Sequence, residues 1–125
     1  MSRRTVCAIA LAALAGCGSP SLFLIECPVD RNRRLSGACA PMLDVRADRE
    51  GDLYRFWGRL SAAEPGESLH NARVTVVETS RRVEIGRDGR FVIDSLRAHH
   101  TLRFSADDHR NLHRNVGTLY DLVRG

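Results

Sequence analysis

The chain has 125 residues, of which 19 are basic and 15 acidic, and every basic residue is arginine. This length allows one small domain with a modest core and leaves no room for two. Charges of both signs are interspersed, and no basic run is longer than Arg33-Arg34 or Arg81-Arg82. The clustered footprint of a nucleic-acid-binding protein is therefore missing, and we expect no nucleic acid partner.

Residues 1–16 have the pattern of a targeting segment. Arg3 and Arg4 give a positive start, and an uncharged run rich in Ala and Leu follows from Val6 to Ala15. A membrane-spanning helix needs about 20 apolar residues, so this run is too short to stay in a bilayer. The pattern predicts a signal peptide over 1–16 that is removed after export.

The segment Leu14-Ala15-Gly16-Cys17 resembles the lipobox of bacterial lipoproteins. The resemblance implies cleavage before Cys17 and a covalent lipid on its thiol, which is the only cofactor that we expect. Several acyl chains would hold the protein firmly on a membrane. Gly18 at the second mature position, instead of Asp, resembles outer-membrane lipoproteins, so the expected location is the bacterial cell envelope, on the periplasmic or surface face. The alternative is an ordinary secretory signal peptide.

Residues 17–50 are predicted to form a lipidated tether and a disulfide loop. Cys27 and Cys39 are the cysteines that remain once Cys7 is removed and Cys17 is acylated, and in an oxidising compartment they are expected to pair. Closing this loop would stabilise the fold by about 3 kcal/mol. A redox or metal pair would favour a tighter Cys-x-x-Cys spacing. The apolar run Leu22–Ile25 is either an edge strand or a segment that rests on the lipid surface.

Residues 51–125 show the period-two alternation of half-buried strands. Tyr54, Phe56 and Leu60 alternate with polar residues, and turn residues such as Asp88-Gly89 separate further alternating segments. Strand spacing of this kind predicts an all-β sandwich with about seven strands. The later strands are expected over residues 72–78, 83–85, 90–94, 101–106 and 116–123, with a loop or one helical turn at 107–115 and no competing helix.

Four segments in order resemble the carboxypeptidase regulatory-like domain. They are Gly58-Arg59-Leu60, Asn71-Ala72-Arg73-Val74, Asp88-Gly89-Arg90-Phe91 and Thr101-Leu102-Arg103-Phe104. The resemblance implies a transthyretin-like, Ig-like sandwich of about seven strands that lacks catalytic residues and acts as an accessory, adhesive or positioning module. The chain departs from the family pattern at residues 97–101, where members of the family commonly have a Pro-Gly-x-Tyr stretch.

Four histidines in the loops on either side of one predicted strand suggest a metal site. Imidazole and carboxylate groups together suit zinc, copper or nickel, and Asp107 and Asp108 lie nearby. On one helical turn, His109 and His113 would share a face. The alternative is a set of ordinary exposed loop residues. The candidate ligands are His99, His100, His109 and His113.

Arg55, Trp57 and Arg59 are predicted to share the exposed face of one strand. An aromatic ring between guanidinium groups could stack on a sugar or a peptide. The alternative is that Trp57 fills the edge of the sandwich. These residues favour a non-catalytic envelope module with an envelope protein or a glycan as partner.

An enzymatic alternative is the transthyretin-related hydrolysis of a ureide. The enzymes of that group end in Tyr-Arg-Gly-Ser and carry an N-terminal His motif. This chain ends in Val123-Arg124-Gly125, and after the signal peptide its first histidine is His70. The sequence therefore favours a protein that is not an enzyme.

Overall fold

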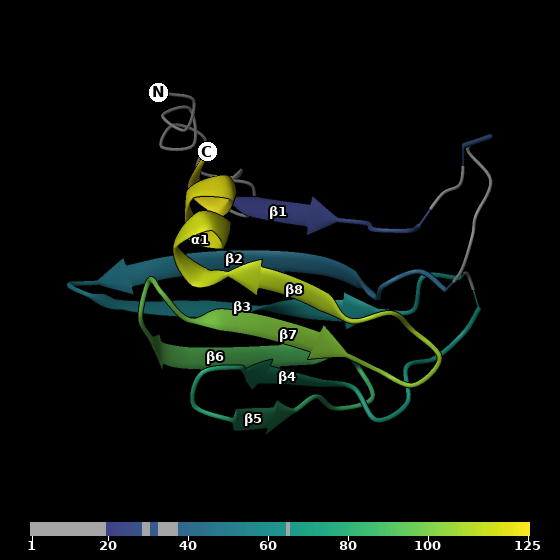
Figure 1. The fold of residues 1–125 in the computed structure, drawn as a ribbon. Coiled ribbons are helices and arrows are strands. Elements are labelled where there is room, and N and C mark those ends of the chain that lie inside the picture. The colour runs from purple at the N-terminus through teal and green to yellow at the C-terminus, as the bar shows by residue number, and fades with distance from the viewer. Residues whose placement is uncertain (1–19, 29–30, 33–37, 65) are drawn as a thin grey trace, which may run out of the picture.

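The computed structural model of the chain describes residues 20–28, 31–32, 38–64 and 66–125 (Figure 1). The predicted signal peptide and Cys17 lie outside these ranges. Within them, the strands form two four-stranded antiparallel sheets: sheet I has the order β1-β2-β3-β6, and sheet II has the order β5-β4-β7-β8. The elements are β1 (Ser21–Leu24), β2 (Met42–Glu50), β3 (Leu53–Ser61), β4 (Arg73–Val76), β5 (Arg81–Glu84), β6 (Arg90–Leu96), β7 (Thr101–Ser105), β8 (Leu112–Asn115) and α1 (Val116–Arg124).

The predicted all-β sandwich is confirmed, and its core follows from the alternation in the sequence. On sheet I, Val45, Phe56 and Ile93 are almost completely buried, and on sheet II so are Val74 and Phe104. Because side chains alternate between the two faces of a strand, each sheet has one apolar face. The two sheets bury these apolar faces against each other. The rings of Phe91 and Phe104, one from each sheet, meet edge to face with centroids 5.6 Å apart.

The longest pairing joins β2 to β3, in continuous register from Met42 opposite Ser61 to Glu50 opposite Leu53. Gly58 permits this close approach, because a Cβ atom there would overlap the carbonyl oxygen of Asp44. β1 extends the same sheet, with Leu22 opposite Val45. The sandwich therefore takes in residues before 51, a part of the chain that the sequence pattern assigned to the tether and disulfide loop.

The prediction for the last segment of the chain was wrong. Residues 116–123 form helix α1 instead of a strand, and the predicted loop at 107–115 contains strand β8. Val116, Leu119 and Val123 have the i, i+3, i+7 spacing of one helical face, and all three are buried. Asn115 caps the helix, since its Oδ1 accepts a hydrogen bond of 2.9 Å from the Thr118 amide.

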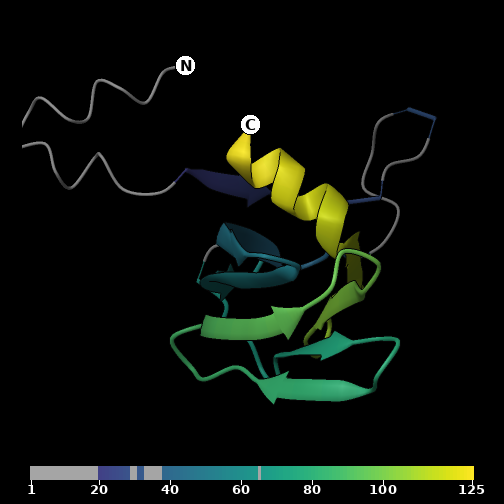
Figure 2. The same cartoon turned by 90° about the vertical axis from the view of Figure 1, so that its left-hand side faces the viewer.

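Helix α1 covers one open side of the sandwich. It contacts β1, β2 and β8, which lie where one edge of sheet I faces one edge of sheet II (Figures 1 and 2). The Tyr120 ring meets Tyr54 of β3 edge to face at 5.1 Å, and the Arg49 guanidinium lies 5.5 Å from the Tyr54 centroid. In the described part of the chain, no helix has the length and apolar character needed to cross a membrane.

The opposite side of the sandwich is joined by an arginine between the edge strands β5 and β6. Arg81 of β5 donates hydrogen bonds to the carbonyl oxygen of Asp94 and, at 3.1 Å, to its carboxylate. β6 is irregular here: the register shifts opposite Arg55, and Ser95 adopts a φ of 58°. This join holds β5 beside β6 and so fixes the positions of Val83 and Glu84.

The predicted disulfide between Cys27 and Cys39 is confirmed, with a Cα–Cα distance of 4.1 Å. The segment that it closes is also attached to the sandwich by polar contacts. The Ala40 amide donates to the carbonyl oxygen of Glu26 at 2.9 Å, and the Glu26 carboxylate forms a 2.9 Å ion pair with Arg114 of β8. These contacts join the residues on either side of the disulfide to each other and to β8 of sheet II.

Candidate functional site

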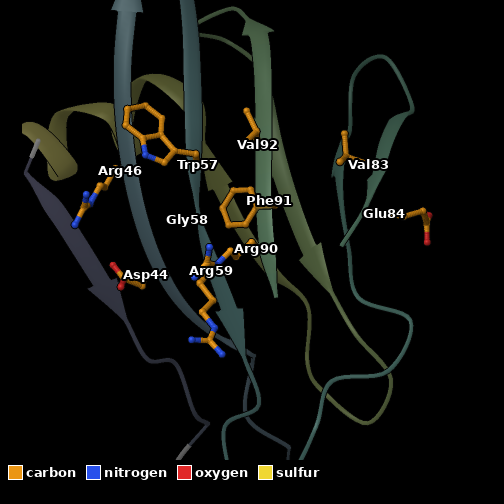
Figure 3. A pocket seen from close by; sticks show the side chains of 10 residues that line it. All are labelled: Asp44, Arg46, Trp57, Gly58, Arg59, Val83, Glu84, Arg90, Phe91 and Val92. Carbon is orange, nitrogen blue, oxygen red and sulfur yellow. The ribbon is translucent and has the colours of Figure 1, made fainter. Parts of the chain in front are cut away.

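The outer face of sheet I carries a hollow of about 660 Å³ (Figure 3). We call it the Trp57 hollow. Side chains of β2, β3 and β6 form its floor, and β5 contributes at the edge where Arg81 holds it. The lining residues are Asp44, Arg46, Trp57, Gly58, Arg59, Val83, Glu84, Arg90, Phe91 and Val92.

Strand alternation and register explain why these side chains meet. Because Leu43 and Val45 face the core, the residues between and beside them, Asp44 and Arg46, face outward. The register then places side chains of neighbouring strands in rows. One row is Arg46, Trp57 and Val92, and the next is Asp44, Arg59 and Arg90. Directly opposite residues lie about 4.5–5.5 Å apart between their Cβ atoms, so each row can contact one ligand.

Trp57 is half-buried and is held in place by a stacked arginine. The Arg55 guanidinium lies 5.0 Å from the centroid of the Trp57 ring, within the range of a cation–π interaction. Asp48 accepts two hydrogen bonds from Arg55, at 3.2 Å and 2.7 Å. These bonds, and then the attraction of the Asp48 charge, raise the pKa of Arg55. Arg55 thus orients the indole and does not itself line the hollow.

The other arginines of the Trp57 hollow differ in how firmly they are held. Arg59 donates from Nε to the carbonyl oxygen of Asp88 at 2.9 Å, which fixes its guanidinium beside the turn before β6. Arg90 lies 4.0 Å from the Asp88 carboxylate in an exposed pair. Within the described ranges, Arg46 and Asp44 form no hydrogen bond or ion pair through their side chains. Their polar groups therefore remain available to a ligand.

The arrangement suits the binding of a molecule that has both an apolar face and polar edges. An indole ring can stack on the face of a sugar or on an aliphatic or aromatic side chain. Guanidinium groups supply donors to carbonyl, hydroxyl or carboxylate oxygens, and Asp44 supplies an acceptor. Phe23 of β1 lies opposite Asp44 and is 56% exposed, so the apolar surface continues beyond the hollow.

Sequence reasoning found Trp57 and Arg59 but missed Asp44, Arg46 and Arg90. The local signal was present, since polar residues alternate with Leu43 and Val45 in the same way as in later strands. What the sequence could not supply is the register, which decides which outward residues of two strands lie side by side.

The predicted metal site is not assembled. Among the described residues, no group of three or more His, Cys, Asp or Glu side chains lies close enough to hold a metal ion. The reason is geometric: His99 and His100 precede β7 and His109 follows it. A five-residue strand separates its two ends by roughly 17 Å. Loops on either side of one strand therefore lie at opposite ends of the sandwich.

The individual histidines have structural partners instead. His100 Nδ1 accepts a 3.0 Å hydrogen bond from the Arg97 amide, and the rings of His99 and His100 contact each other with centroids 4.5 Å apart. His109 Nε2 accepts a hydrogen bond from the Ala63 amide at 3.3 Å, and His109 Nδ1 lies 2.9 Å from the carbonyl oxygen of Asp107. His113 lies in β8 and not on a helix with His109, so the predicted i, i+4 pair does not form.

Comparison with known proteins gave no match to a family model, to a curated protein or to a solved structure.

Proposed function

We propose that this protein is a lipid-anchored lipoprotein of the bacterial cell envelope whose sandwich acts as a non-catalytic binding module for an envelope protein or a glycan. The observation that carries the binding role is the Trp57 hollow, an exposed aromatic and arginine surface on a rigid sheet. The anchor rests on the lipobox-like segment Leu14–Cys17. The resemblance to carboxypeptidase regulatory-like domains supports the same kind of accessory role.

The position of β1 limits how far the sandwich can move from a membrane. β1 begins at Ser21, so residues 18–20 are all that separate it from Cys17. Even fully extended, a chain of this length spans roughly 14 Å. A lipid on Cys17 would therefore hold the sandwich against the bilayer surface, where its ligand must also be found.

The anchor is tested by following the modification of Cys17 in the host. We expect the native chain to incorporate radiolabelled palmitate and to remain in the membrane fraction. Cys17→Ala should lose both the label and the membrane association, whereas Cys7→Ala should keep them, because Cys7 lies in the segment that is removed. Mass spectrometry that finds Cys17 unmodified and still joined to Gly16 in native membranes would contradict the anchor.

The binding role is tested at the hollow itself. The chain contains a single tryptophan, so the intrinsic fluorescence of the purified lipoprotein reports on Trp57 alone. We expect one class of envelope component, either a glycan fragment or a protein, to shift this emission with saturation. Trp57→Ala removes the signal, so binding by this variant is measured by sedimentation and should weaken about tenfold, as for loss of an aromatic anchor.

Cross-linking in living cells identifies the partner. A photoreactive residue at Val92, which lines the hollow and is 59% exposed, should give a discrete cross-linked product. The matched control is the same group at Leu122 of α1, which is 51% exposed and does not line the hollow. Identical products from both positions, together with an unresponsive Trp57, would contradict binding at this face.

A further inference from the structure

The outer face of sheet II carries a second hollow, on the other side of the molecule from the Trp57 hollow. It has a volume of about 590 Å³ and is lined by Arg73, Thr75, Val77, Ser80, Arg82 and Arg103. The side chains come from β4, from the turn that follows it, and from the strands on either side of it. We call it the Thr75 hollow. No predicted site includes any of these residues.

Register places two arginines directly beside the central threonine. Thr75 of β4 lies opposite Arg82 of β5 on one side and opposite Arg103 of β7 on the other. Arg73 lies two residues before Thr75 on the same strand and therefore on the same face. Three arginines from three adjacent strands thus line the same hollow as Thr75.

The threonine hydroxyl is buried without a partner. Thr75 is 6% exposed, and its Oγ1 has no hydrogen-bond partner in the described structure. Ser105, which lies opposite Arg73 on β7, is 5% exposed and its Oγ is likewise without a partner. A buried hydroxyl without a hydrogen bond is unfavourable. A bound ligand with several acceptor oxygens would satisfy it.

The positive charge of the Thr75 hollow is also incompletely compensated. Within the described ranges, Arg103 forms no side-chain hydrogen bond or ion pair, and Arg73 donates only to the carbonyl oxygen of Asn71, at 2.9 Å. Arg82 pairs with Glu84 at 3.2 Å, but these side chains are 59% and 70% exposed, so the pair is weak. Glu84, which lies opposite Arg73 and pairs with Arg82, supplies one negative charge against the three positive charges of these arginines.

We propose that the Thr75 hollow binds a phosphate monoester. The guanidinium groups of Arg73, Arg82 and Arg103 would donate to its oxygens, and Thr75 would donate its hydroxyl hydrogen. A phosphate group offers three acceptor oxygens and nearly two negative charges, which match three guanidinium groups better than a single carboxylate does. The group can belong to a soluble phosphorylated molecule or to a lipid headgroup, and this inference is independent of what occupies the Trp57 hollow.

Calorimetric titration of the purified full-length chain tests this site. We expect inorganic phosphate and phenyl phosphate to bind with saturation, with one equivalent per chain, and acetate at the same ionic strength to bind at least tenfold more weakly. Arg103→Gln should weaken phosphate binding about tenfold, because it removes a charge-assisted hydrogen bond. Arg87→Gln, at an exposed position in the turn before β6, should bind phosphate like the native chain.

A second variant separates a binding role from a structural one. Thr75→Val keeps the shape of the side chain and removes only the hydroxyl group, so it should preserve or raise the melting temperature. We expect it nevertheless to weaken phosphate binding several-fold. Equal affinity of native chain and Thr75→Val, equal loss in Arg103→Gln and Arg87→Gln, or no saturable binding up to about 50 mM phosphate would overturn the proposal.

Vesicles distinguish the source of the phosphate. Retention of Cys17→Ala, but not of Cys17→Ala with Arg103→Gln, on phosphatidylcholine vesicles that contain phosphatidic acid would support a lipid headgroup, because neither chain carries the acyl groups that would hold a lipoprotein on any vesicle. Binding of phenyl phosphate without such retention would support a soluble ligand. Retention that is equal for both chains, without phosphate binding in solution, would overturn the site.

Discussion

At the scale of single residues, the tightest packing constraint that we find is Gly58. It lies in the middle of the β2–β3 pairing, and it has no room for a Cβ atom because the carbonyl oxygen of Asp44 lies there. Gly58→Ala should therefore push β2 and β3 apart and lower the free energy of unfolding by about 2 kcal/mol or more. Chemical denaturation followed by circular dichroism measures this change.

The control for Gly58 is another glycine of the same chain. Gly86 has an ordinary φ, and a Cβ atom there would have only the Asp88 carboxylate as a neighbour, at 3.5 Å. Gly86→Ala should therefore change stability little. If Gly58→Ala were as stable as Gly86→Ala, the close approach of β2 to β3 would be contradicted.

Glu78 is a second residue whose environment has a measurable consequence. Its carboxylate accepts hydrogen bonds from the Thr101 amide at 2.7 Å and from the Thr101 hydroxyl at 2.8 Å. These bonds lower the pKa of Glu78. A carboxylate whose pKa is lower in the folded state stabilises the fold above its unfolded pKa, and this contribution disappears as the pH falls through the folded pKa.

The expected pH dependence is specific to this carboxylate. The melting temperature of Glu78→Gln should lie below that of the native chain at pH 7, and the difference should shrink as the pH falls through the lowered pKa of Glu78. Glu67→Gln, at an exposed position, should match the native chain throughout this titration. A constant difference between Glu78→Gln and the native chain over this range would show that protonation of Glu78 is not involved.

At the scale of elements, helix α1 depends on Asn115, the capping residue just before it. Asn115 accepts from the Thr118 amide, and its Nδ2 donates to the carbonyl oxygens of Ala98 and His100 at 3.1 Å and 3.3 Å. It thus starts the helix and joins it to the turn before β7. Asn115→Ala should lower the free energy of unfolding by about 1–2 kcal/mol.

Asn111 provides the comparison for this prediction, since it is exposed and precedes β8. Asn111→Ala should remain within about 0.5 kcal/mol of the native chain. Hydrogen exchange should also show faster exchange of the α1 amides in Asn115→Ala only. Unchanged exchange in that variant would argue against the capping role.

The elements also show how far sequence reasoning reaches. Strands such as β4 and β6 were predicted correctly, because alternation at Val74 and Val76 or at Phe91 and Ile93 is a local signal. Helix α1 was missed, since its residues carry β-branched Val and Thr and aromatic Tyr as well as a helical spacing. These residues form a helix because their apolar face covers the open side of the sandwich. That contact depends on the tertiary structure and cannot be read from the local sequence.

The candidate site was predictable in part for the same reason. Trp57 and Arg59 stand out because of their residue types and because one strand supplies both. Arg46 lies beside Trp57, and Arg90 lies beside Arg59, only because of the register of β2, β3 and β6. The predicted histidine site is not assembled, because the prediction assumed that the loops before and after β7 lie close together. The length of β7 keeps these loops apart.

At the scale of the whole molecule, the disulfide is the covalent link between the two ends of the loop that joins β1 to β2. Opening this loop raises the conformational entropy of the unfolded chain, so Cys27→Ser with Cys39→Ser should lower the free energy of unfolding by about 3 kcal/mol. Urea denaturation with and without a reducing agent measures it. The reducing agent should destabilise the native chain and leave the double variant unchanged; an effect on both would point to another cause.

The three side chains that α1 places in the core, Val116, Leu119 and Val123, come from the final stretch of the chain, while β1 and β2, which they cover, come from its beginning. Helix α1 must therefore be synthesised, after all eight strands of the described chain, before this side of the hydrophobic interior can be covered. Until then the nascent polypeptide exposes the apolar side chains of β1 and β2 that α1 will cover, and such exposed surface favours aggregation.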